Sequence, residues 1–221
     1  MTSSVPAASV PPKPPARGSD RFVAYVHTLC ESNGTRADLR RGLGLPVERC
    51  NYLHRYLVPW LTKRTDPDHK VHPDAKRAHY AVAALIAARP RSARDTPPAG
   101  ATDDAPAVDW YQRANLGAAF AQAVTKGVMK PGTAESTLHL MCRQSAEAIH
   151  PGLPALTRRL LNGRIPVDWA VLLEDLSFWN RYRDKVATRW LESYFRTTSA
   201  EPADDSNPSS ATPDTFEETV R

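Results

Sequence analysis

The sequence predicts an all-α protein built from two bundle-like helical lobes that a flexible linker joins. Apolar residues recur at helical spacing through most of the chain, whereas the alternation of apolar and polar residues that marks a strand is almost absent. A proline-rich stretch without periodicity separates the two helical halves. At 221 residues, the chain is long enough to bury most of its apolar surface as one large domain or two small ones.

Four helices are predicted for residues 21–90, the N-terminal lobe. Each places its apolar residues on one face, and each has a start or stop signal at its ends. They cover residues 21–32, 36–44, 47–61 and 73–89. Thr35 is expected to cap the second, which has the sequence RADLRRGLG, and Pro59 is expected to break the third.

Residues 91–107 are predicted to be a disordered linker, because they combine prolines with polar residues and show no periodicity. Helical periodicity resumes in residues 108–198, the C-terminal lobe. The expected helices are 115–124, a helix capped by Thr133, 153–161, 167–179 and a last helix through 186–194. Trp169, Trp179 and Trp190 fall on the apolar stripes and are expected to pack in the core. Residues 1–20 and 199–221 are predicted to be disordered tails.

The folded part of the chain carries a surplus of positive charge. The net charge of the whole chain is +5, but six acidic residues lie in the last 22 residues beside one arginine. Residues 21–199 hold 26 lysines and arginines against 17 aspartates and glutamates. This surplus favours a polyanionic partner such as nucleic acid or anionic lipid.

The N-terminal tail has no apolar run, so it is predicted to be neither a signal peptide nor a membrane anchor. We therefore expect a cytoplasmic protein with no membrane partner. The three cysteines are far apart, which indicates neither a disulfide framework nor a zinc site.

No catalytic or metal site is indicated by the motifs. His69 and His72 with Asp66 and Asp68 could suggest a metal site, but they fall in an expected loop without supporting spacing. Ser145 has no base at a recognisable spacing, no nucleophile elbow or ordered triad pattern appears, and GLGLP lacks the lysine of a phosphate-binding loop. The sequence therefore predicts a protein that is not an enzyme and needs no cofactor or metal.

Basic residues form five clusters along the predicted helices, on the sides away from the apolar stripes. Tyr80 is expected on the exposed side of its helix with the second cluster. The clusters are Arg36, Arg40 and Arg41; Lys76 and Arg77; Arg143; Arg158 and Arg159; and Arg181, Lys185 and Arg189. Such surfaces suit the phosphate backbone, which they bind regardless of base sequence.

Two other functions fit the same pattern. The segment TRADLRRGLGLPVERCNYLHRYL has the order of a helix-turn-helix, in which recognition would fall to Glu48, Arg49, Asn51, Tyr52 and Arg55. Alternatively, the protein is a helical scaffold whose basic faces meet acidic protein partners. A complex that is insensitive to salt would favour the scaffold.

Seven segments in order resemble the CasB family, the small subunit of the type I-E CRISPR surveillance complex Cascade. They are RADLRRGLGLPV, YLVPWL, HYAVAALIAARP, NLGAAFAQAV, TAESTLHLMCRQS, IPVDWAVLLEDLSFWN and VATRWLESYFR. The resemblance runs from about residue 22 to residue 196 and has no counterpart for the linker or the acidic tail.

The resemblance implies a noncatalytic, all-helical subunit that lies beside a second copy of itself, other Cascade subunits and guide RNA. It further implies that the basic surface binds single-stranded and double-stranded DNA, holds the displaced non-target strand and so stabilises the R-loop. Carried over by position, the contact residues would be Arg40, Arg41, Lys76, Arg77, Arg143, Arg158, Arg159, Arg181, Arg183 and Lys185.

Overall fold

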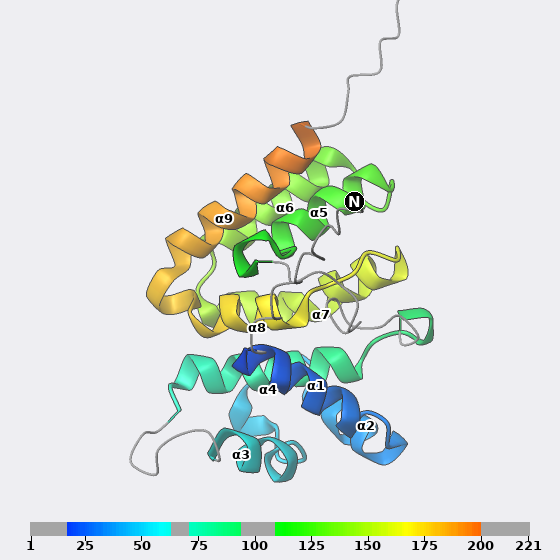
Figure 1. The fold of residues 1–221 in the computed structure, drawn as a ribbon, viewed down its shortest axis with the longest axis vertical. Coiled ribbons are helices and arrows are strands. Elements are labelled where there is room, and N and C mark those ends of the chain that lie inside the picture. The colour runs from blue at the N-terminus through cyan, green and yellow to red at the C-terminus, as the bar shows by residue number, and fades with distance from the viewer. Residues whose placement is uncertain (1–16, 63–70, 94–108, 200–221) are drawn as a thin grey trace, which may run out of the picture.

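The computed structural model describes residues 17–62, 71–93 and 109–199, and the regular structure in these ranges is entirely helical (Figure 1). This confirms the all-α prediction. Short 3-10 helices are labelled η. The elements are α1 (Gly18–Leu29), α2 (Asn33–Arg40), η1 (Val47–Arg49), α3 (His54–Thr62), α4 (Pro73–Ala87), η2 (Arg91–Ala93), η3 (Trp110–Gln112), α5 (Leu116–Thr125), α6 (Pro131–Arg143), α7 (Ala146–Asn162), α8 (Trp169–Ser177) and α9 (Trp179–Ser199).

The helices lie in layers along the long axis of the molecule (Figure 1). At one end α2 and α3 pack beneath α1 and α4, and at the other end α5, α6 and α9 form a bundle. Between them lie α7 and α8, and α8 packs mainly on α4 and α1. One continuous hydrophobic core includes buried residues from all of these layers. The two halves of the sequence therefore contribute to one common core, and α8, from the second half, packs against α1 and α4 of the first half.

The predicted lobe boundaries and linker remain predictions, because residues 94–108 lie outside the described ranges. Within those ranges, α1 begins at Gly18, ahead of the predicted start at residue 21, and residues 91–93 form η2. No helix in the described ranges has both the length and the apolar character that a membrane crossing requires.

Three helix starts differ from the predictions. Ser32, not Thr35, caps α2, since its Oγ accepts a hydrogen bond from the Thr35 backbone N–H at 3.4 Å. Helix α6 begins at Pro131, whose fixed backbone angle suits the first helical position, so Thr133 is already inside the helix. Helix α7 begins at Ala146 and continues through two prolines, whereas a helix starting only at residue 153 was expected.

The prediction that Pro59 breaks the third helix is also wrong, because α3 contains Pro59 and continues to Thr62. The preceding residues form η1 and a turn instead of one long helix. Tyr80 is 1% exposed, so the expectation that it lies on the exposed side of α4 is wrong as well. It packs edge-on against His54 of α3, with ring centroids 5.5 Å apart.

Helices α5 and α9 approach each other closely at Gly117. A Cβ added to Gly117 of α5 would lie 1.8 Å from the carbonyl oxygen of Trp190. Trp179 and Trp190 are both completely buried, with ring centroids 4.9 Å apart, which confirms their expected place in the core. Glycine is therefore required for α5 and α9 to pack at this distance.

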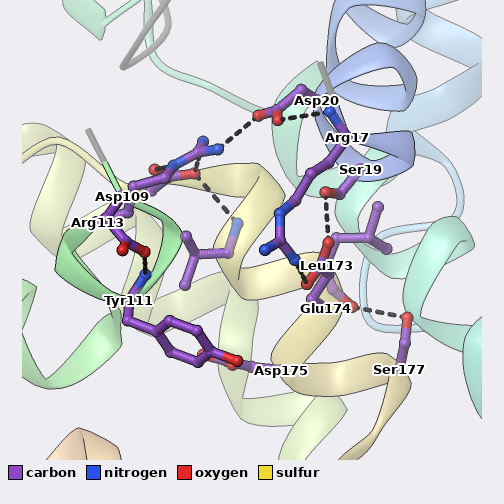
Figure 2. Close-up of polar contacts among 12 residues, drawn as sticks. Arg17, Ser19, Asp20, Asp109, Tyr111, Arg113, Leu173, Glu174, Asp175 and Ser177 are labelled. Atoms are coloured by element: carbon purple, nitrogen blue, oxygen red, sulfur yellow. Dashed lines mark hydrogen bonds and ion pairs between the residues drawn. The ribbon is translucent and has the colours of Figure 1, made fainter. Parts of the chain in front are cut away.

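Arg113 joins three elements by ion pairs (Figure 2). Its guanidinium donates two hydrogen bonds of 2.8 Å to Asp168, the N-cap of α8, and one of 2.7 Å to Asp20 of α1. Nearby, the Ser19 hydroxyl donates to Glu174 of α8 at 2.8 Å. These contacts fix η3 and the start of α8 against α1.

His150 of α7 is 9% exposed, and neither of its ring nitrogens has a hydrogen-bond partner among the described residues. Burial, and next the neighbouring Arg77 charge, lowers the pKa of His150 to about 4, although Asp74 and Glu147 act in the opposite direction. The folded protein therefore holds this imidazole neutral at pH values where the unfolded chain takes up a proton.

Stability is expected to fall as the pH falls below 6.5, the ordinary histidine pKa, and this contribution levels off near pH 4. Each pH unit in this window costs about 1.4 kcal/mol, so His150 alone should lower the free energy of unfolding by about 2 kcal/mol between about pH 7.5 and about pH 5. Urea denaturation at the two pH values would measure the loss. His150→Leu should lose less than the wild type does, and equal losses in both proteins would contradict the assignment.

Candidate nucleic-acid interface

Basic residues from three parts of the sequence come together beside the start of α9. The Asn180 side chain donates a hydrogen bond to Asp74 of α4 at 2.9 Å, and the Trp179 indole N–H donates to the Gln144 carbonyl at 3.0 Å. The first turn of α4, the connection between α6 and α7 and the start of α9 therefore lie side by side. We call the basic residues on these segments the junction cluster. They are Lys76, Arg77, Arg143 and Arg181.

Only one member of the junction cluster has an acidic partner among the described residues. Arg77 donates to Glu147 at 3.0 Å and is 26% exposed. Arg143 and Arg181 are exposed, Lys76 is half-buried, and none of the three forms an ion pair within the described ranges. No acidic side chain in the described ranges therefore competes with an external anion for these three cations.

The arginines of α2 have different environments. Arg36 is half-buried and donates to the carbonyl oxygen of Cys30, so it caps the end of α1 and does not remain solvated as expected. Arg41 pairs with Asp38 at 3.3 Å and lies over the Tyr52 ring at 4.4 Å. Arg40 is exposed and without an ion pair among the described residues. Of the three, Arg40 has the greatest freedom to contact a ligand.

Asp38 is the acid that neutralises this region. Its carboxylate accepts hydrogen bonds from the Tyr56 hydroxyl and from Arg55 and Arg41. The Tyr56 hydrogen bond, with the two arginines, lowers the pKa of Asp38, although partial desolvation opposes this shift. Asp38 therefore stays ionised and holds α2 against α3.

Arg158 and Arg159 are exposed near the end of α7. Arg159 donates to the Val128 carbonyl at 3.0 Å, and Lys126 donates to the Arg164 carbonyl at 3.3 Å. The loop after α5 therefore lies against the end of α7. Lys126, just after α5, and Arg164, just after α7, therefore join this cluster, and neither was predicted because both lie beyond the helix ends.

The predicted basic face of α9 is interrupted. The backbone of Tyr182 is not helical, so Arg181 lies before a kink and does not continue the face of Lys185. Both cations lie over the Tyr182 ring, at 5.2 Å and 5.4 Å, and Arg183 pairs with the exposed Asp184 at 3.3 Å. These side chains remain exposed to solvent.

Arg189 does not belong to the solvated face that was predicted for it. Its guanidinium pairs with Asp175 of α8, which is 2% exposed and also accepts a hydrogen bond from the Trp190 indole N–H at 2.7 Å. Arg189 therefore serves mainly to hold α9 against α8.

A groove of about 570 Å³ runs along α9 on both sides of Arg189, which also lines it. Its walls include Lys185, Thr188, Ser193, Arg196 and the exposed Tyr111 of η3. Neither Tyr111 nor Arg196 was predicted from the sequence as a site residue. No periodic signal marks η3, because it is a single turn that follows residues without regular periodicity.

The helix-turn-helix interpretation is wrong for the residues it named. Glu48 and Arg49 lie in η1, Asn51 and Tyr52 in the following turn, and Arg55 alone lies in α3. A recognition helix needs its base-reading side chains on one face of a single helix. In addition, Arg55 is already bound to Asp38.

Within the described ranges, no set of three or more histidine, cysteine or acidic side chains is arranged to hold a metal ion. His72 lies beside Asp74, whereas His69, Asp66 and Asp68 lie outside those ranges. Burial raises the pKa of the Cys142 thiol to about 11, which is unsuited to a nucleophile.

The residues that the structure describes thus define an all-helical fold whose surface carries separate clusters of cations. Residues 35–195 match the family model of CRISPR-associated protein Cse2. The chain belongs to the Cse2 family, also called CasB.

Three solved structures illustrate the similarity. A chain of a structure described as a CRISPR RNA-guided surveillance complex is 34% identical, with a TM-score of 0.68 over 82% of this chain and 93% of that chain. CasB from M. ruber is 24% identical, with a TM-score of 0.61 over 82% and 94% of the two chains. CasB from Thermus thermophilus is 21% identical, with a TM-score of 0.59 over 82% and 99%. A search among curated proteins found no match.

Proposed function

We propose that this protein is the noncatalytic small subunit of a type I-E CRISPR surveillance complex, in which it holds the backbone of the displaced non-target DNA strand and stabilises the R-loop. Membership of the Cse2 family supports the place in such a complex. The observation that carries the proposed role is the set of basic side chains without an acidic partner in the described ranges. They include Arg40, Lys76, Arg143, Arg158 and Arg181.

These cations suit a phosphate backbone better than they suit base edges. They lie on several helices instead of one, so they can follow a flexible strand but cannot enter a single groove together. Each phosphate that they neutralise releases counterions, whatever the base sequence. Guide RNA pairing would supply the sequence specificity.

Modest energies are sufficient for this role. R-loop formation exchanges a DNA duplex for a heteroduplex of similar stability, so the equilibrium is close to balanced. A few phosphate contacts can therefore decide whether the loop persists. Partner subunits, guide RNA and a second copy of the chain would meet the remaining surface.

The test is binding of the purified full chain to labelled single-stranded and duplex DNAs of unrelated sequence, over a range of salt concentrations. Binding that is indifferent to sequence and falls steeply with salt would support the proposal. Tight binding to one duplex alone would contradict it, and so would the absence of binding at low salt. A salt-insensitive complex with acidic proteins would support the scaffold instead.

The variant Lys76→Ala, Arg143→Ala, Arg181→Ala should weaken binding to all sequences equally. Each lost contact with a single strand should reduce the slope of log affinity against log salt by about 0.7, so the triple variant should lose about two units. Arg49→Ala is the control, because Arg49 is exposed and lies in η1, outside the clusters. Sequence-dependent loss in the control would instead support the helix-turn-helix interpretation.

A further inference from the structure

Tyr111 is unusual among the aromatic side chains of this protein. It is 77% exposed and forms part of the wall of the α9 groove. An aromatic ring of this size normally contributes to a core or a binding surface. Within the described core, no apolar partner explains the position of Tyr111.

The turn that carries Tyr111 is held firmly in place (Figure 2). Asp109 caps η3 by accepting a hydrogen bond from the Tyr111 backbone N–H at 3.0 Å. The guanidinium groups of Arg17 and Arg113 both lie over the neighbouring Trp110 ring, at 4.2 Å and 4.8 Å from its centroid. Arg113 is in turn fixed by two carboxylates, so the backbone of Tyr111 is anchored while its side chain remains exposed.

The charges beside Tyr111 leave a small positive surplus. Arg189 is neutralised by Asp175, and Asp184 by Arg183. Lys185, Arg196 and Glu192 then remain as the unpaired charges of the groove, within the described part of the chain. Lys185 and Arg196 are separated by about 16 Å along the helix, at 1.5 Å per residue. Thr188 and Ser193 place hydroxyl groups between them.

We propose that this groove is a subsite for single-stranded nucleic acid, in which a base stacks on Tyr111 while Lys185 and Arg196 bind phosphates of the same strand. The proposal rests on the strand-holding function and assigns that strand a specific place on η3 and α9. An aromatic platform beside a basic groove is the arrangement by which proteins bind single strands without reading their sequence.

The stacking contact makes the subsite selective for the unpaired strand. Bases in a duplex are covered on both faces by their neighbours, so Tyr111 cannot stack on them unless the duplex opens. Phosphates, in contrast, are equally available in both forms. Tyr111 should therefore distinguish single-stranded from duplex DNA, whereas Lys185 and Arg196 should affect the binding of both.

The experiment compares Tyr111→Ala with wild-type full chain in binding to a labelled thymine oligonucleotide and to a duplex. Loss of one stacked base should weaken single-strand binding about five-fold to a hundred-fold, with duplex binding and the salt slope unchanged. Tyr111→Trp should retain binding because it preserves the ring face. Phe195→Ala is the matched control. Phe195, in α9, is also an exposed aromatic residue, but it does not line the groove.

The charged residues provide a second measurement. Lys185→Ala with Arg196→Ala should weaken both DNA forms and flatten the salt slope, whereas Glu192→Gln should strengthen both, because a repelling carboxylate is removed. If the wild-type chain binds DNA and Tyr111→Ala binds single strands with the same affinity, the subsite is wrong and the proposed function still holds. A wild-type chain that binds neither DNA form would overturn the proposed function itself.

Discussion

The Gly117→Ala variant is expected to lose more than about 3 kcal/mol of stability, which is a large part of the total for a domain of this kind. The added methyl group would meet three backbone atoms of Trp190, the nearest at 1.8 Å. Backbone atoms cannot move aside as a flexible side chain can, so α5 and α9 would have to separate. Separation would open the core around the buried Trp190 ring. Urea denaturation followed by tryptophan fluorescence would measure the change.

Gly152→Ala is the matched control for this prediction. Gly152 lies in α7, and a Cβ there would meet no atom within 4 Å. Since alanine favours a helix over glycine, this variant should be unchanged or more stable by about 0.5 to 1 kcal/mol. If both variants had the stability of the wild type, the close approach of α5 and α9 would be wrong.

The Asp175→Ala variant is expected to lose about 3 to 5 kcal/mol, because it breaks a buried ion pair and removes only one partner. The Arg189 charge would remain partly buried, and the Trp190 indole N–H would lose its acceptor. Asp175→Asn should lose less, since an amide oxygen can still accept from the indole. Thermal unfolding should show a fall in Tm of about 10 °C for the alanine variant.

Asp184→Ala tests whether burial causes this effect. Asp184 pairs with Arg183, and its side chain is 92% exposed. Surface pairs of this kind contribute about 0 to 1 kcal/mol, so the Tm should hardly change. Similar losses at the two positions would show that Asp175 is not the buried acceptor described above.

Helical periodicity was sufficient to predict the fold class and the main core residues. It predicted the buried positions of Trp179 and Trp190 because regular spacing places them on the apolar face of a helix. It failed at helix starts, since Ser32 and Pro131 compete with nearby residues that are equally good local signals. It also could not show that α8 packs on α1 and α4, because that contact joins segments far apart in the chain.

The candidate site was harder to predict for a related reason. Sequence spacing shows which basic residues share a helix face but not which acids fold back onto them. Arg36 and Arg189 were therefore expected in solvent, although the fold gives one a backbone carbonyl and the other a buried carboxylate. The junction cluster arises only from tertiary contacts such as the Asn180 to Asp74 hydrogen bond.

The position of α8 has a consequence for synthesis on the ribosome. Helices α1 and α4 are complete early, yet much of the surface that they bury lies against α8, which is made near the end of the chain. Until residue 177 has left the ribosomal exit tunnel, those apolar faces have no partner. The nascent first half must then remain partly folded, as an intermediate that is prone to aggregation. A chain that terminates between α4 and α8 would thus be an incompletely folded fragment, which chaperones would bind and proteases would degrade.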